Sequence, residues 1–125
     1  MDVRFPVTRD PGNFSEVIEL DLRDVDYIET HQTGFVVFHT KDEVFYPVVP
    51  KLSILEKHLE DLGFLRLDRT NLSNIEKIRY YDEERSLVFF NDKISKSSKF
   101  TTVSSSMKKM LKNRLARRSG RNGNH

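Results

Sequence analysis

The basic residues of this 125-residue chain are gathered at one end. Positions 93–125 hold 10 Lys and Arg and no acid, whereas positions 1–92 hold 11 Lys and Arg against 19 Asp and Glu, a balance of −8. Clustered ammonium and guanidinium groups bind phosphate oxygens, while an acidic body keeps such a chain in solution. Nucleic acid is therefore the first partner to consider. The plainer alternative is a solvated, flexible end with no partner.

Catalytic chemistry has little to build on in this sequence. Of the four histidines, His125 is terminal, His58 falls on a predicted helix surface and His39 falls in a predicted strand, which leaves His31 in a polar turn. The absence of Cys excludes a thiol nucleophile, a disulfide and a thiolate metal site. Neither an HExxH motif nor a Gly-rich phosphate loop occurs. We therefore predict no enzyme activity, no metal and no cofactor.

Length and hydropathy predict one domain with two flanking segments. A chain of this size can bury a core without disulfides. Residues 1–14, with two prolines and mixed charges, are expected to form an N-terminal arm, residues 15–112 the domain, and residues 113–125 a flexible basic tail. Nothing resembles a signal peptide, and no run reaches the roughly 18 apolar residues of a membrane span. We therefore expect a cytoplasmic location without membrane contact.

Alternating apolar and polar residues predict a mainly β fold. The expected strands are residues 17–22, 27–29, 35–40, 43–46, 64–67, 75–81, 87–90 and 93–97. Gly34 permits a turn before the third strand. Pro47 lacks an N–H, so it should end the fourth strand or confine it to a sheet edge.

Two helices are expected. The clear one is amphipathic and covers about residues 51–62, where leucines recur at three- and four-residue spacing and Gly63 supplies the stop. These leucines are Leu52, Leu55, Leu59 and Leu62. The other is a C-terminal helix at Phe100–Leu111, in which Thr and Ser lower the helix propensity.

The segment Phe64–Ile78, FLRLDRTNLSNIEKI, resembles without a gap the signature of LytTR DNA-binding domains, F-x-R-x-H-R-S-x-L-V-N-x-x-x-I. The surrounding order agrees, with D-V-x-Y-I-E at 24–29, a hairpin ending in Phe45-Tyr46, the Leu-rich helix and a late Ser95-Lys96. The resemblance covers about residues 15–112. It implies an elongated β fold of antiparallel strands and a transcription regulator that reads double-stranded DNA with loops in the major groove.

Carried over by position, the resemblance implies three reading loops. Their candidate DNA contacts are His31, Gln32 and Thr33; Arg69, Thr70 and Asn71; and Lys96, Ser97 and Lys99. Arg can bond two acceptors of guanine, Gln and Asn can match adenine, and Lys and hydroxyl groups suit phosphates. The resemblance also implies sites upstream of promoters, at paired direct repeats, and a homodimer on DNA. Two alternatives to DNA contact remain. The first loop is a plain solvated turn in one, and Arg69 forms an ion pair with Asp68 in the other.

Two positions depart from the signature, Asp68 in place of His and Ser73 in place of Val. An acid repels phosphate, so Asp68 either pairs with Arg66 or Arg69 or marks a weaker DNA binder. Two rival functions follow. One is a protein-binding modulator that has lost DNA reading, and the other is RNA binding through the tail. Because about 14 residues precede the first expected strand, we expect no receiver domain and regulation by abundance, a partner or self-association.

Overall fold

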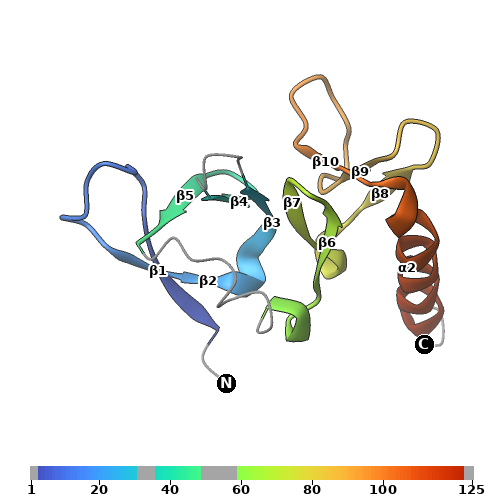
Figure 1. Cartoon of the computed structure of the whole chain (residues 1–125), viewed down its shortest axis with the longest axis horizontal. Coiled ribbons are helices and arrows are strands. Elements are labelled where there is room, and N and C mark those ends of the chain that lie inside the picture. The colour runs from blue at the N-terminus through green and yellow to red at the C-terminus, as the bar shows by residue number, and fades with distance from the viewer. Residues whose placement is uncertain (1–2, 31–35, 49–58, 123–125) are drawn as a thin grey trace.

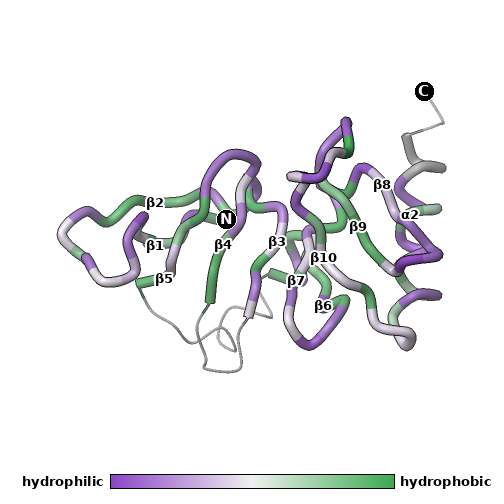
Figure 2. The backbone as a smooth tube through the Cα atoms, turned by 90° about the horizontal axis from the view of Figure 1, so that it is seen from above, coloured by the Kyte–Doolittle hydropathy of each residue, from purple (hydrophilic) through white to green (hydrophobic). Residues whose placement is uncertain are grey.

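The computed structural model describes residues 3–30, 36–48 and 59–122. Within these residues the fold is mainly β and elongated (Figure 1), with β1 and β2 towards one end and the helix α2 (Lys108–Asn122) at the other. Figure 2 shows the hydrophilic colouring concentrated on the turns and on α2. The fold therefore confirms the predicted class.

Seven antiparallel strands form the larger sheet, in the order β2-β1-β5-β4-β3-β7-β6. They are β1 (Arg4–Thr8), β2 (Ile18–Asp21), β3 (Val25–Thr30), β4 (Val36–Thr40), β5 (Val44–Pro47), β6 (Phe64–Asp68) and β7 (Asn71–Asn74). A short 3-10 helix, η1 (Leu22–Asp24), joins β2 to β3. Asp21 caps it, because the Asp21 carboxylate accepts a bond from the Arg23 amide. Pro47 does end β5, but β5 lies inside the sheet between β1 and β4.

Three strands form the smaller sheet, in the order β10-β9-β8. They are β8 (Tyr80–Asp82), β9 (Leu87–Phe89) and β10 (Phe100–Thr102). Two further 3-10 helices, η2 (Ile75–Lys77) and η3 (Ser105–Met107), connect β7 to β8 and β10 to α2. Apolar side chains of α2 pack with this part of the fold through the fully buried Leu111.

The core consists of two clusters of buried apolar side chains. One lies within the larger sheet and includes Val7, Ile28, Phe38 and Phe64. The other joins the two sheets to α2 and includes Tyr27, Leu67, Ile75, Ile78, Val88, Phe90, Val103 and Leu111. Tyr27, on β3, thus belongs to the second cluster although its strand lies in the first sheet. Burial therefore continues across the boundary between the sheets.

The predicted N-terminal arm is wrong for residues 4–8, which form β1. Val7 is fully buried, and Phe5 packs at 5.8 Å from Phe38 between ring centroids. Apolar residues on either side of Pro6 alternate as in a strand, and Pro6 itself accepts a bond from the Val48 amide. The two prolines favoured an irregular arm in the prediction, although residues 4–8 form a strand with an apolar inward face.

The C-terminal predictions need correction as well. Phe100–Thr102 is strand β10, and the helix begins at Lys108 and runs to Asn122, through the segment expected to be a flexible tail. Residues 93–97 form no strand, and within 75–81 η2 precedes a shorter strand. The predicted helix at 51–62 lies mostly outside the described residues. Its end fits, because residues 59–61 are helical and Gly63 has φ +97°.

Candidate nucleic-acid interface

The second predicted reading loop is a two-residue turn between β6 and β7. Asp68 pairs with Asn71 in the strand register, so Arg69 and Thr70 form the tip. Two-residue hairpin turns that match strand twist need a positive φ. Among the described non-glycine residues, Ser86 alone has one, at 57°. The turn is therefore not of a twist-matched type, and side-chain and backbone bonds from neighbouring residues hold it.

Those contacts come from the end of β3 and from β6. The carbonyl oxygen of Arg69 accepts from Thr30 Oγ1 and from Arg66 Nη1, both at 3.0 Å. The Thr30 amide donates to the carbonyl oxygen of Thr70 at 2.8 Å. Thr30 is the first residue of the first predicted loop and immediately precedes the candidate DNA contact His31. The backbone of the second loop is thus fixed beside the residue at which the first begins.

The side chain of Arg69 is exposed. In the part of the chain that the structure describes, its guanidinium makes no hydrogen bond and no ion pair. Other exposed arginines differ, because Arg23 pairs with Asp21 at 2.7 Å and Arg85 with Asp82 at 2.8 Å. Arg69 therefore presents an unpaired guanidinium from a backbone that hydrogen bonds hold in place.

The third predicted loop precedes β10 and is held mainly by its own hydroxyl groups. Ser98 Oγ accepts from the Ser95 amide at 2.8 Å, and the Ser95 and Ser97 hydroxyls lie 3.1 Å apart. Lys96 and Ser97 are exposed, and the Lys96 ammonium has no partner among the described residues. In Figure 1 this loop rises on the same side of the molecule as the β6–β7 turn.

Lys99 does not fit the phosphate-binding role predicted for it. Its Nζ donates to the carbonyl oxygens of Thr40 at 2.9 Å and Glu43 at 3.4 Å, which ties the loop to the β4–β5 turn. Burial lowers the pKa of this ammonium, while Asp26 and Asp42 act in the opposite direction. Lys99 is therefore a structural lysine whose head group is already engaged.

One depression of about 410 Å³ connects the two loops. Its lining comes from β3, β7, the third loop and β10: Tyr27, Glu29, Thr70, Asn71, Ser97, Ser98, Lys99, Phe100, Thr101 and Thr102. We call it the trough. Residues 70 and 97, which are far apart in sequence, therefore share one surface feature, and Arg69 and Lys96 directly adjoin them in the chain.

The wall that β3 contributes to the trough is stiffened by ring packing. The Tyr27 ring stacks on His39 at 4.3 Å and on Phe90 at 5.4 Å between centroids. His39 Nε2 lies 2.8 Å from Glu29 Oε1. Burial, helped by Glu29 and Asp26, raises the pKa of Tyr27 to about 12, so this phenol stays neutral.

Asn71, predicted to contact DNA, is instead committed to the interior. It is 3% exposed. Its Nδ2 donates to the carbonyl oxygen of Thr102 at 3.0 Å, and its Oδ1 accepts from Ser73 Oγ at 2.9 Å. Both polar ends of the amide are occupied within the protein, so in this structure Asn71 offers no unpaired polar atom to a base.

The remaining predictions have separate outcomes. His31, Gln32 and Thr33 lie outside the described residues. Asp68 Oδ2 accepts from Thr102 Oγ1 at 2.6 Å, a partner that the sequence did not suggest. In the described ranges, no group of three or more His, Asp or Glu could hold a metal ion. Those same ranges contain no helix long and apolar enough to cross a membrane.

Sequence reasoning missed the β3 and β10 residues of the trough. Tyr27 and Glu29 fell in a predicted strand, where alternation gives no hint of a shared surface. Thr101 and Thr102 were assigned to a helix. The usable signal was the pair of threonines beside Phe100, since β-branched and aromatic residues favour strands.

Comparison with known proteins agrees with this geometry. The LytTr DNA-binding domain family matches residues 15–116. A solved LytTr DNA-binding domain from Bacillus cereus has a similar fold, with a TM-score of 0.64 and 16% sequence identity over 90% of this chain and 96% of that one. A comparison with curated proteins finds no similar sequence. The family match covers most of the chain, and the chain therefore belongs to the LytTR family of DNA-binding domains.

Proposed function

We propose that this chain regulates transcription by reading double-stranded DNA in the major groove with the β6–β7 turn and the loop before β10. One observation carries the proposal. Thr70 and Ser97 line a single trough, and the exposed Arg69 and Lys96 stand directly beside them in the chain. Two loops on one surface can meet one side of a duplex together.

The two cations suit different tasks. The planar fork of Arg69 matches O6 and N7 of guanine, and a good bidentate contact of that kind contributes about 1–3 kcal/mol of discrimination. Lys96 carries a flexible point charge that suits a phosphate, as do the nearby hydroxyls of Thr70 and Ser97. We therefore assign recognition of a base to Arg69, and to Lys96 the phosphate contact that fixes the position of the protein on DNA.

The contact made by Asp68 weakens the case for the rival modulator. That reading rested partly on an acid at a DNA-facing position. The Asp68 carboxylate accepts a 2.6 Å bond from Thr102, so it has a role inside the protein. An acid engaged in this way is compatible with DNA binding by its neighbours.

The first experiment is selection of bound fragments from a random DNA pool, followed by titrations of the winning sequence and of a scrambled duplex. We expect a recurring motif that contains guanine. Paired direct repeats and a homodimer on DNA stay predictions, and the same selection tests them, because paired sites would appear as two copies of the motif at fixed spacing.

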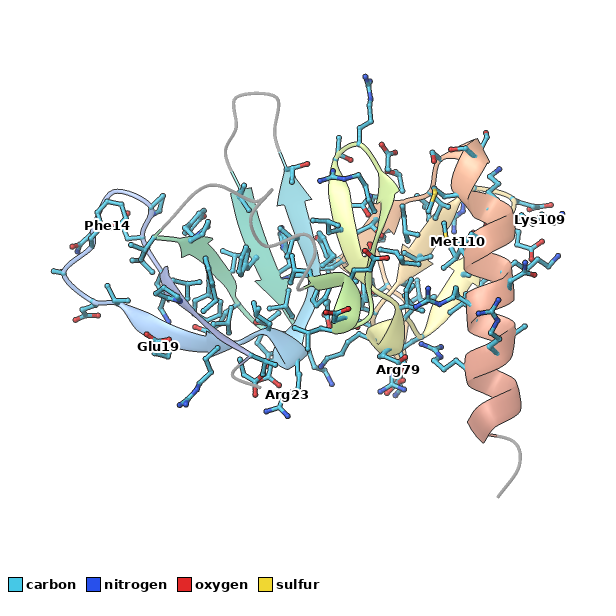
Figure 3. All side chains as sticks on the ribbon, turned by 60° about the horizontal axis from the view of Figure 1, so that its bottom comes forward. Phe14, Glu19, Arg23, Arg79, Lys109 and Met110 are labelled. Carbon is cyan, nitrogen blue, oxygen red and sulfur yellow. The ribbon has the colours of Figure 1, made fainter. Side chains whose placement is uncertain are left out.

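The second experiment compares Arg69→Ala with Arg23→Ala in the same titrations. Arg23 is exposed and lies on the opposite side of the molecule from the tip of the β6–β7 hairpin (Figure 3), so it serves as the matched control. Arg69→Ala should cost about 1–3 kcal/mol of sequence preference, and Arg23→Ala should leave it unchanged. No retardation of any duplex at low salt, where electrostatic attraction is strongest, would leave the modulator as the better reading.

A further inference from the structure

A network of polar side chains joins β6 and β7 to β10. Asn71 and Ser73 on β7 bond to Thr102 and Thr101 on β10, and Asp68 at the end of β6 bonds to Thr102. Three of these residues are buried, with Ser73 fully so, Asn71 3% exposed and Thr101 4% exposed. These strands belong to different sheets and share no backbone ladder, and past the end of β10 the Ser104 amide donates to the carbonyl oxygen of Leu67 at 2.7 Å. The side-chain network adds contacts to this backbone bond at the position of Asp68.

The donors and acceptors of the network can be ordered. Ser73 has a single hydroxyl proton and gives it to Asn71 Oδ1 at 2.9 Å, so Thr101 must supply the proton of its 2.9 Å bond to Ser73. On the other side, Asn71 Nδ2 donates to the backbone of Thr102. Every buried polar atom of Asn71 and Ser73 named here has a partner, and such fully satisfied networks hold a single arrangement.

The network ends at the Asp68 carboxylate. The 2.6 Å distance from Thr102 Oγ1 lies in the range of hydroxyl bonds to ionised carboxylates, which are stronger than neutral ones. Asp68 is also the residue that pairs with Asn71 to close the hairpin before Arg69. A pull on Asp68 from β10 therefore acts directly on the turn that presents Arg69.

We propose that Asp68 is a positioning residue: through Thr102 and the Asn71–Ser73 pair, it fixes the Arg69 turn relative to the loop that precedes β10. The inference rests on the proposed function for its consequence in DNA reading. It gives one physical reason for both departures from the family signature, since Asp68 and Ser73 each supply a group to the same network. A valine at position 73 could neither donate to Asn71 nor accept from Thr101.

Four variants test this role: Asp68→Ala, Asp68→Asn, Thr102→Val and the double variant Asp68→Ala/Thr102→Val. The measured quantity is the ratio of affinities for the selected sequence and for a scrambled duplex. Asp68→Ala and Thr102→Val should each lower this ratio at least about fivefold, because a displaced Arg69 loses part of its base contact. The double variant should lose no more than the worse single variant, since both break one contact.

Asp68→Asn separates the hydrogen bond from the charge. Its amide oxygen can still accept from Thr102, so its ratio should stay within about twofold of the parent. Losing the negative charge should raise the affinity for the scrambled duplex in Asp68→Asn and Asp68→Ala alike. If Asp68→Asn lowered the ratio as much as Asp68→Ala, or if Asp68→Ala kept the parental ratio, the positioning role would be refuted.

A measurement on the free protein distinguishes the positioning role of Asp68 from the proposed DNA-reading function. In the free protein, Asp68→Ala should shift the backbone amide resonances of residues 97–100, whereas Asp68→Asn should leave them close to the parental positions. If these resonances shift but the parent protein shows no preference among DNA sequences, the proposed function is refuted. The contact between the β6–β7 turn and the loop before β10 is then still supported. Unmoved resonances in Asp68→Ala would overturn the positioning role whatever the DNA result.

Discussion

The guanidinium of Arg118, on α2, donates a hydrogen bond to the carbonyl oxygen of Ile78 at 2.7 Å. A second nitrogen of the same group donates to the carbonyl oxygen of Ile75. Ile75 is the first residue of η2 and Ile78 is its C-cap residue, whose amide also donates to the Ile75 carbonyl at 3.3 Å. Together with the buried Leu111 and the partly buried Leu115, Arg118 makes α2 an integral part of the fold.

Arg118→Ala should lower the free energy of unfolding by about 1–3 kcal/mol, the usual cost of removing a charged donor from partly buried acceptors. Urea denaturation followed by circular dichroism measures it. Arg117→Ala is the matched control, because Arg117 is exposed on the same helix and should change stability by less than about 0.5 kcal/mol. Equal stability of the two variants would mean that α2 is not held by this contact.

The docking of α2 also changes how RNA binding through the tail should be tested. Deleting residues 113–125 would remove Leu115 and Arg118, so a loss of binding could reflect unfolding. The cleaner variant is Lys109→Gln/Arg117→Gln, which neutralises two exposed charges and spares the packed face; Figure 3 labels Lys109 on α2. Loop reading predicts unchanged preference among DNA sequences. Loss of all nucleic-acid affinity would favour the tail.

Lys96 and Lys99 should behave differently although they lie three residues apart. Lys96→Ala should reduce the slope of log affinity against log salt by about 0.9, the contribution of one phosphate contact. Lys99→Ala should leave the slope unchanged, because its ammonium already bonds to Thr40 and Glu43, and should lower stability by about 1 kcal/mol. Titrations at four salt concentrations and urea denaturation measure both effects. Equal slope losses would show that Lys99 leaves its carbonyl partners to bind DNA.

Sequence alone predicted the β class, most strands of the larger sheet and the positions of the second and third loops. The period of two in apolar residues carried that information for strands such as β2, although consecutive residues of β3 and β7 are buried on both faces. It failed where polar residues are buried. Asn71 and Ser73 were expected in or beside a surface loop, yet they lie inside strand β7, where β10 supplies partners from 28 to 31 residues away.

The same limit applies to the C-terminus. Composition predicted a flexible end at residues 113–125, because polar and basic residues dominate that segment. The partners that order the helix are backbone carbonyls 40 and 43 residues earlier, and no local pattern reveals them. Long-range contacts to backbone acceptors thus explain why the sequence predicted neither the burial of Asn71 nor the C-terminal helix.

Asp26 gives a prediction about pH. It is 6% exposed, and burial raises its pKa above the ordinary value of 3.8 despite nearby lysines. The folded protein therefore holds this proton more tightly than the unfolded chain, so Asp26 makes stability fall as pH rises from about 3.8 through the raised pKa. Asp26→Asn should raise the melting temperature at pH 7 and raise it less at pH 4. A larger gain at pH 4 would contradict the assigned direction.

Arg69→Lys tests whether position 69 reads a base or only attracts DNA. Lysine keeps the positive charge, so the affinity for a scrambled duplex and its salt slope should match the parent. It lacks the planar fork, so preference for the selected sequence should fall by about 1–3 kcal/mol. The turn itself should persist, because its bonds from Thr30 and Arg66 go to the backbone of residues 69 and 70. If Arg69→Lys kept full preference while Arg69→Ala lost affinity for every sequence alike, Arg69 would be a phosphate contact, and reading would have to come from another loop.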